Sequence, residues 1–228
     1  MYKGKIMKLI AFDLEACNRY VPGSIFSVGV VEADFNFNIK DKYNILINPE
    51  TKFVTKFRKP IEFNVDEKAL RDKKNFFTAY KSLKKLFNQD AVFMAHSISN
   101  DIRMLNCACK RYNMPSFHFK FICSQMLYSI YSNTSEGIGL NDAGILMGTE
   151  FVHHNAEEDA LISIKLVEYI CKMKKVSLNE LLIEYGVEFG SLKNFQITHM
   201  QSTLLDEQRR VRKLERIREK NNKIIENI

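Results

Sequence analysis

The fold of this chain is best inferred from one stretch near its start, Lys8-Leu9-Ile10-Ala11-Phe12-Asp13-Leu14-Glu15. Residues 6–12 are almost continuously apolar, which predicts a buried central strand. In a strand, Asp13 and Glu15 leave the same face while Leu14 points the other way. Two carboxylates at the end of a strand suit a hard divalent cation. For so short a motif, a strand end that turns polar at the solvent is the commoner explanation.

Two more strands are predicted immediately after this stretch, at residues 23–31 and 42–47, and Pro49 closes the second of them. The links between the first three strands are short. Short links favour hairpin connections, so we expect an antiparallel meander.

Helices and strands alternate over the rest of the chain. Helices are expected at residues 66–87, 102–112, 124–131, 140–147 and 155–174, and strands at residues 91–95 and 117–123. This order predicts an α/β domain with a five-stranded mixed sheet flanked by helices. Composition changes after Lys175, which predicts a first domain at residues 1–175 and a helical C-terminal extension at residues 176–228.

Composition and charge restrict the class of protein. The chain has 228 residues, of which 46% are hydrophobic and 27% charged, as in folded globular proteins. The net charge of +7 is compatible with a polyanionic partner, although many soluble proteins are mildly basic. The longest apolar stretches are too short for a membrane span, and no signal peptide is predicted.

The cysteines indicate a reducing compartment. The chain has five, an odd number, without a Cys-x-x-Cys pair. We therefore expect reduced thiols in a cytoplasmic protein, including Cys17, for which packing is favoured over redox chemistry.

A third carboxylate is predicted at the start of a helix. The short strand at residues 91–95 leads into a helix that Ser99 or Asn100 could cap, which places Asp101 in its first turn. The simpler alternative is that Asp101 only favours the helix dipole.

A further acidic signal is His154-Asn155-Ala156-Glu157-Glu158-Asp159-Ala160. Residues five apart lie about 140° apart on a helix, so His154 and Asp159 cannot share a face if both are helical. Asn155 as N-cap, with Glu158 completing a capping box, would place His154 in the preceding loop and Asp159 in the first turn.

The neighbours of this pair are expected to have lesser roles. Glu157 and Glu158 suit a helix N-terminus, and that is taken to be their whole role. His153 is expected to point away from the site.

Together these residues resemble a known family. The ordered set Asp13-x-Glu15, Asp101 and His154-x4-Asp159 is similar to the DEDDh group of 3′–5′ exonucleases, the superfamily of the proofreading exonuclease of bacterial replicative polymerases. The resemblance covers residues 8–174. It extends to Asn18, Ser24, Ser27 and Gly29, which look like stand-alone bacterial members. It implies a ribonuclease-H-like fold with a five-stranded mixed sheet.

The resemblance also implies a site and a mechanism. Asp13, Glu15, Asp101 and Asp159 would hold two Mg²⁺ or Mn²⁺ ions, and His154 would be the general base. These five residues are the predicted catalytic set.

The chain departs from the family where substrate is bound. Ala16 stands where the family has Thr, residues 96–100 replace a more usual His-Asn-x-x-Phe, and Cys123-Ser124 replaces Asp-Thr. The predicted substrate-binding residues are Leu14, Ala16, Cys17 and His96. The departures bear on the substrate preference more than on metal binding.

Two basic regions are candidate partner surfaces. One carries Lys73, Lys74, Lys81, Lys84 and Lys85, for which a solvated helix face is an equally good explanation. The other is the helix expected from residue 204 to the end, with an apolar stripe of Val211, Leu214, Ile217, Ile224 and Ile228. Packing or self-association is favoured for this helix; it could also grip nucleic acid through Arg209, Arg210, Arg212 and Lys213, or dock on a polymerase.

The predicted function is a metal-dependent 3′–5′ exonuclease that removes nucleoside monophosphates from single-stranded 3′ ends, with DNA favoured over RNA. The alternatives are an exoribonuclease and a non-catalytic subunit that binds nucleic acid or a polymerase.

Overall fold

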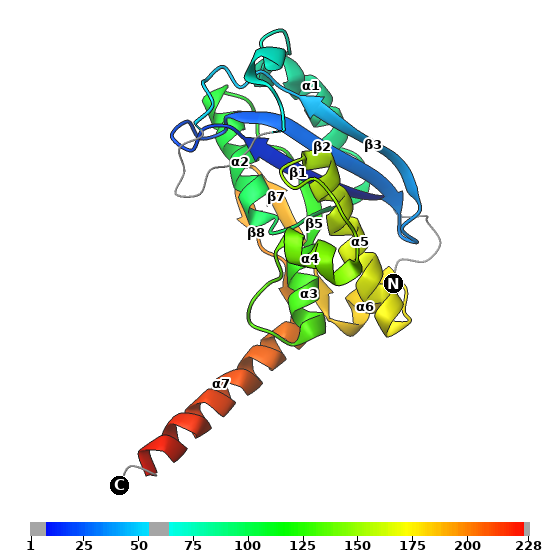
Figure 1. Cartoon of the computed structure of the whole chain (residues 1–228), viewed down its shortest axis with the longest axis vertical. Helices are drawn as coiled ribbons and strands as arrows, with labels where there is room; N and C mark the ends of the chain where they lie inside the picture. The colour runs from blue at the N-terminus through cyan, green and yellow to red at the C-terminus, as the bar shows by residue number, and fades with distance from the viewer. Residues whose placement is uncertain (1–7, 55–63, 226–228) are drawn as a thin grey trace.

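The computed structural model describes residues 8–54 and 64–225. The predicted start of the first strand, at residue 6, lies outside these residues. Within them, one sheet of seven strands in the order β3-β2-β1-β4-β5-β7-β8 forms the centre of the molecule, and helices lie on its faces (Figure 1).

The predicted meander is confirmed. Its strands are β1 (Lys8–Ala16), β2 (Ile25–Asp34) and β3 (Ile39–Leu46), and each neighbouring pair is antiparallel. Next come β4 (Ala91–Ala95), parallel to β1, and β5 (Phe119–Cys123), parallel to β4. The carboxyl ends of β1, β4 and β5 therefore meet at one edge of the sheet.

The helices follow the predicted order, with one break. They are η1 (Glu67–Leu70), α1 (Phe76–Phe87), α2 (Ser99–Arg111), α3 (Ser124–Ser132), α4 (Leu140–Met147), α5 (Ala156–Lys174), α6 (Leu178–Glu184) and α7 (Thr203–Ile225). The prediction of a single helix at residues 66–87 is wrong, since η1 and α1 occupy this range as two separate helices. Asn75 starts a new helix there, because its extended backbone and its side-chain bond from the Thr78 N–H form an N-cap.

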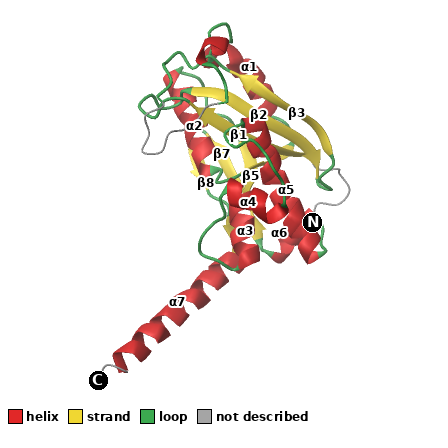
Figure 2. Ribbon diagram, in the orientation of Figure 1, coloured by secondary structure: helices red, strands yellow, loops and turns green. Residues whose placement is uncertain are grey.

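The C-terminal segment contributes strands as well as helices. β7 (Gly190–Lys193) pairs with β5, and β8 (Gln196–Thr198) pairs with β7, so the sheet has seven strands and not five. β6 (Val187–Glu188) and β9 (Gln201–Ser202) form a separate small ribbon. The segment from residue 176 is thus not purely helical, and the boundary at residue 175 stays a prediction. Helix α7 projects from the body (Figure 2).

The core surrounds β1. Phe12 is fully buried and meets Phe87, Phe93 and Phe119 edge-on, at centroid distances of 5.2 to 6.2 Å. Phe12 therefore packs the core, and its ring is not available to stack on a base.

Helix α5 packs against β1 and β2, and a glycine sets how closely it approaches. A Cβ on Gly29 would lie 2.0 Å from the carbonyl carbon of Ala156, the first residue of α5. Gly29 also pairs with Asp13 across β1 and β2. The absence of a side chain at residue 29 therefore lets the N-terminus of α5 reach the sheet beside the carboxylates.

Across residues 8–54 and 64–225, none of the helices combines the length and apolarity that crossing a bilayer requires. All five cysteines are free thiols, as predicted.

Candidate active site

Three elements bring the predicted carboxylates to the edge where β1 ends. Asp13 and Glu15 leave the same face of β1 and are half-buried. Asp101, only 3% exposed, lies in the first turn of α2, as predicted, and its Oδ1 accepts a hydrogen bond from the Leu14 N–H at 3.1 Å. The predicted cap by Ser99 or Asn100 is wrong: the N-cap position is Ile98, which has no capping side chain.

The fourth carboxylate enters from the first turn of α5, where Asp159 is 2% exposed. Asn155 is the N-cap, as predicted, and its Oδ1 accepts from the Glu157 N–H at 3.2 Å. The capping box with Glu158 does not form. Instead the side chain of Glu158 turns outward, with a carboxylate oxygen 3.8 Å from the Lys42 ammonium.

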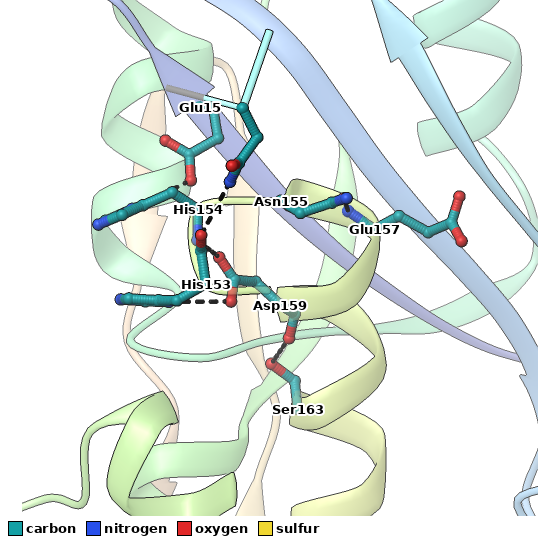
Figure 3. Close-up of polar contacts among 8 residues, drawn as sticks. Glu15, His153, His154, Asn155, Glu157, Asp159 and Ser163 are labelled. Atoms are coloured by element: carbon teal, nitrogen blue, oxygen red, sulfur yellow. Dashed lines mark hydrogen bonds and ion pairs between the residues drawn. The ribbon is translucent and has the colours of Figure 1, made fainter. Parts of the chain in front are cut away.

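His154 lies in the loop before α5, as predicted. Its backbone is left-handed, with φ 64°, and its N–H donates to Asp159 Oδ2 at 3.1 Å. Its Nδ1 lies 3.5 Å from Glu15 Oε1 (Figure 3). Because φ > 0 costs energy for a side chain of this size, the bond to Asp159 helps to hold the loop.

His153 does not point away from the site, contrary to the expectation. Its Nδ1 lies 3.1 Å from Asp159 Oδ1, and its ring stacks on that of His154 with centroids 4.1 Å apart (Figure 3). The backbone of His153 is held by Asn64, whose Nδ2 donates to the His153 carbonyl at 2.9 Å. The left-handed residue 154 turns both rings to one side, a feature that the local sequence does not signal.

Burial and mutual repulsion make the carboxylates hard to ionise. Burial raises the pKa of Asp13 well above its usual value, and Asp101, Glu15 and Asp159 raise it further. Burial and Asp159 raise the pKa of Glu15 to about 7. Burial also raises the pKa of Asp159, against the opposing effect of His153. Carboxylates this close together can all be ionised near neutral pH only beside a compensating cation.

The histidine is tuned in the opposite direction. Burial, together with the neighbouring His153, lowers the pKa of His154. A lower pKa keeps the imidazole neutral near pH 7, which is the form that can accept a proton.

The donor set fits divalent cations. Ligand atoms of Asp13, Glu15 and Asp159 all lie within 4.8 Å of one another. Asp101 lies outside this group of three but is coupled to it electrostatically. Oxygen ligands of this kind are those that Mg²⁺ and Mn²⁺ prefer. A second group, His153, His154 and Asp159, meets the same distance criterion.

The predicted substrate-binding residues next to the acidic pair are mostly buried. Leu14 is 4% exposed and belongs to the main core, while Ala16 is half-buried. Cys17 packs with Phe26 and Leu70, and burial raises the pKa of its thiol to about 11. This confirms the expected packed thiol. A substrate contact by these residues stays a prediction. Because the side chains of Leu14 and Cys17 are buried, their backbone atoms would have to make it.

His96 is held in a hydrogen-bond network at the end of β4. Its Nδ1 lies 2.9 Å from Ser124 Oγ, and its Nε2 lies 2.7 Å from the carbonyl oxygen of Ile138. Burial lowers the pKa of the ring. A neutral ring that donates from Nε2 and accepts at Nδ1 satisfies both contacts, so His96 ties the α3–α4 loop to the sheet.

The sequence profile of a family described as exonuclease, of the RNase T type, matches residues 10–167. That range contains all five predicted catalytic residues. No curated protein matches the chain by sequence.

Solved structures of nucleases share the fold. A full-length 3′-exonuclease is 13% identical, with 88% of this chain and 93% of that chain covered and a TM-score of 0.63. A 3′-exonuclease solved in the 3′-end-specific recognition of a histone mRNA stem-loop is 14% identical, with the same coverage and a TM-score of 0.56. E. coli exonuclease I with a dA16 oligonucleotide is 12% identical, with 78% of this chain but 43% of that chain covered and a TM-score of 0.58. At these identities the similarity shows the fold alone, which is the ribonuclease-H-like fold of such exonucleases.

Proposed function

The chain belongs to the RNase T exonuclease family, and on that premise we propose that it is a metal-dependent 3′–5′ exonuclease acting on single-stranded ends. The observation that carries the proposal is the convergence of four carboxylates from β1, α2 and α5 beside a neutral histidine. Buried carboxylates repel one another, so their retention at one point favours a cation-binding role.

Asp13, Glu15 and Asp159 would hold divalent cations, with Asp101 contributing to the same site. When bound, such cations activate water and stabilise the departing 3′ oxygen of a phosphodiester. His154 would take the proton from the attacking water, since its lowered pKa leaves the imidazole neutral. His153 and the loop amide of residue 154 orient the Asp159 carboxylate, one on each oxygen.

Single-stranded DNA is the substrate that we propose over RNA. Among the similar structures, the name of one refers to a histone mRNA stem-loop and that of another to a dA16 oligonucleotide, so the fold itself serves both. An exoribonuclease is therefore the closest alternative.

Labelled ends test the activity, its direction and the substrate together. Single-stranded DNA and RNA of one sequence, labelled at the 5′ end, would be incubated with Mg²⁺, Mn²⁺ or EDTA. We expect a ladder that shortens from the 3′ end with either metal and is absent with EDTA, and faster shortening of DNA. Faster shortening of RNA would reverse the substrate assignment. If neither strand shortened with any metal, the catalytic proposal would fail in favour of a non-catalytic binding subunit.

A further inference from the structure

Helix α7 carries a dense positive charge that the active site does not use. Residues 209–220 contain seven Lys or Arg and two Asp or Glu, a local charge of +5 in a chain whose net charge is +7. This part of α7 extends away from the rest of the molecule (Figure 1).

The base of α7 is fixed to the body. Leu205 is 3% exposed, and Gln208 Nε2 donates to the Ile130 carbonyl at 2.9 Å. Arg212 Nη1 donates to the Asn133 carbonyl at 3.1 Å and to Asn133 Oδ1 at 2.8 Å. These contacts with the end of α3 set the direction in which the exposed part of α7 runs.

The charges are sorted on the helix surface. At 100° per residue, Arg209, Lys213, Arg216 and Lys220 fall within a strip about 60° wide and about 16 Å long, which we call the basic strip. All four are exposed. Glu215 and Glu219 lie outside the strip. Val211 and Leu214 lie on the other side of the helix, and Ile217 lies about 40° beyond one edge of the strip.

A groove joins the basic strip to the edge of the sheet. Its walls include Cys123, Gln125, Thr134, Arg209 and Arg212, and its volume is about 240 Å³. Cys123 is the last residue of β5, and the carboxylates stand at the same edge on β1. Two strand spacings separate β5 from β1, about 10 Å.

We infer that this groove and the basic strip form an extended binding surface for the single-stranded nucleic acid upstream of the 3′ end held in the active site. The position of the 3′ end rests on the proposed function, but the binding surface does not require cleavage. Charge complementarity identifies the occupant, because a phosphate backbone presents regularly spaced negative charges. A second copy of the strip would instead bring like charges together.

The test neutralises three of the four residues of the basic strip and leaves Arg212, which anchors the helix, unchanged. In the variant K213Q/R216Q/K220Q, which we call the arm variant, Gln replaces side chains of similar helix propensity, and circular dichroism would verify the helix. The matched control, K81Q/K84Q/K85Q, removes three exposed charges from α1. Binding of a fluorescent single strand of about twenty nucleotides would be followed by anisotropy in EDTA over a range of salt concentrations.

We expect the arm variant to bind about tenfold more weakly at low salt, and its plot of log K against log salt to be shallower by about 2, since each lost contact with a single strand removes about 0.7. The α1 variant should bind like wild type. Unchanged binding by the arm variant would overturn the inference, as would an equal loss in the α1 variant.

Activity gives a second readout. With Mn²⁺, the preference of wild type for a strand of about twenty nucleotides over one of about four should fall about tenfold in the arm variant. If the variant changed the molecular mass in solution but neither binding nor length preference, α7 would be a protein interface and the inference would be wrong. If the arm variant bound more weakly but wild type cleaved no substrate, the binding surface would be supported and the proposed catalysis would be wrong.

Discussion

The edge of the sheet at β1 and the projecting part of α7 concentrate opposite charges by opposite means. At the sheet edge, burial brings carboxylates together, and their pKa values rise because repulsion and lost hydration oppose ionisation. On α7, the basic side chains stay in water, where they keep their hydration and attract opposite charges within a Debye length of about 8 to 10 Å. The first arrangement is suited to holding cations in fixed positions, and the second to attracting a mobile polyanion.

Breaking the buried cluster should have the largest effect. Asp159→Asn keeps the shape of the side chain but removes one cation ligand, and we expect the rate of 3′ shortening to fall at least about a thousandfold. The matched control is Glu158→Gln, one residue earlier in α5, where a carboxylate faces Lys42 and not the site. Equal losses in the two variants would contradict the assignment of Asp159.

Removing the imidazole should affect the chemical step without removing the cations. We expect His154→Ala to lower kcat about a hundredfold to a thousandfold, which lies within the range of about a hundredfold to ten-thousandfold that is usual for a general base. Calorimetry should show Mn²⁺ binding close to that of wild type. Complete loss of Mn²⁺ binding would make His154 a ligand in place of a base.

Part of this site was predictable from the sequence, and the reason is local geometry. The alternation of a strand places Asp13 and Glu15 on one face, and the capping preference of Asn155 separates His154 from Asp159. The role of His153 was not predictable, because it depends on the left-handed backbone of residue 154 and on a bond from Asn64, which is 89 positions away in the chain.

The same distinction applies to the fold. β1 to β5 have apolar or alternating patterns that identify them without knowledge of their partners. β7 and β8 have four and three residues, too few for a periodic signal, and they form only because the edge of β5 is available for pairing. Non-local pairing of this kind turned part of the predicted helical extension into sheet.

The pH dependence of stability tests the cost of the buried charges. The pKa of Glu15 in the folded protein is raised to about 7 from 4.5. The folded state therefore binds the proton more tightly, and the free energy of unfolding of the metal-free protein should fall as pH rises from about 4.5 to 7, by at most about 3 kcal/mol. In EDTA, urea unfolding should show Glu15→Gln more stable than wild type at pH 8 and nearly equal to it at pH 5.

The contrasting carboxylate is Glu180, whose pKa is lowered by hydrogen bonds from the Ser177 backbone and side chain. Ionised Glu180 therefore adds to the free energy of unfolding at pH values above the pKa of Glu180 in the unfolded chain. This contribution is lost as the pH falls through the pKa of Glu180 in the folded protein. Glu180→Gln should therefore destabilise the protein at pH 8, opposite in sign to Glu15→Gln. The same sign for both variants would show that burial does not raise the pKa of Glu15. Adding Mn²⁺ should remove the greater stability of Glu15→Gln, because the cation binds the folded wild type and compensates the charge of Glu15.

The smallest effect is expected on the exposed side of α7. Leu214 is 51% exposed, so Leu214→Ala should change the free energy of unfolding by no more than about 0.5 kcal/mol. Leu205 lies at the buried base of the same helix, and Leu205→Ala should lower the free energy of unfolding by about 2 to 5 kcal/mol. Urea unfolding of both variants measures the difference. A large, concentration-dependent loss in Leu214→Ala would show that the apolar stripe is covered by another copy of the chain.

Gly29 makes the active site vulnerable at a position that performs no chemistry. Any side chain there would collide with the first residue of α5, the helix that carries Asp159 and follows the histidine loop. The sheet and the helix could each survive such a change by shifting apart, and the carboxylates would then lose their common centre. In a random-mutagenesis screen for folded but inactive variants, we expect substitutions of Gly29 to be recovered together with those of the acidic residues. A survey of tolerated sequence variation would thus mark as essential a residue that binds neither metal nor substrate.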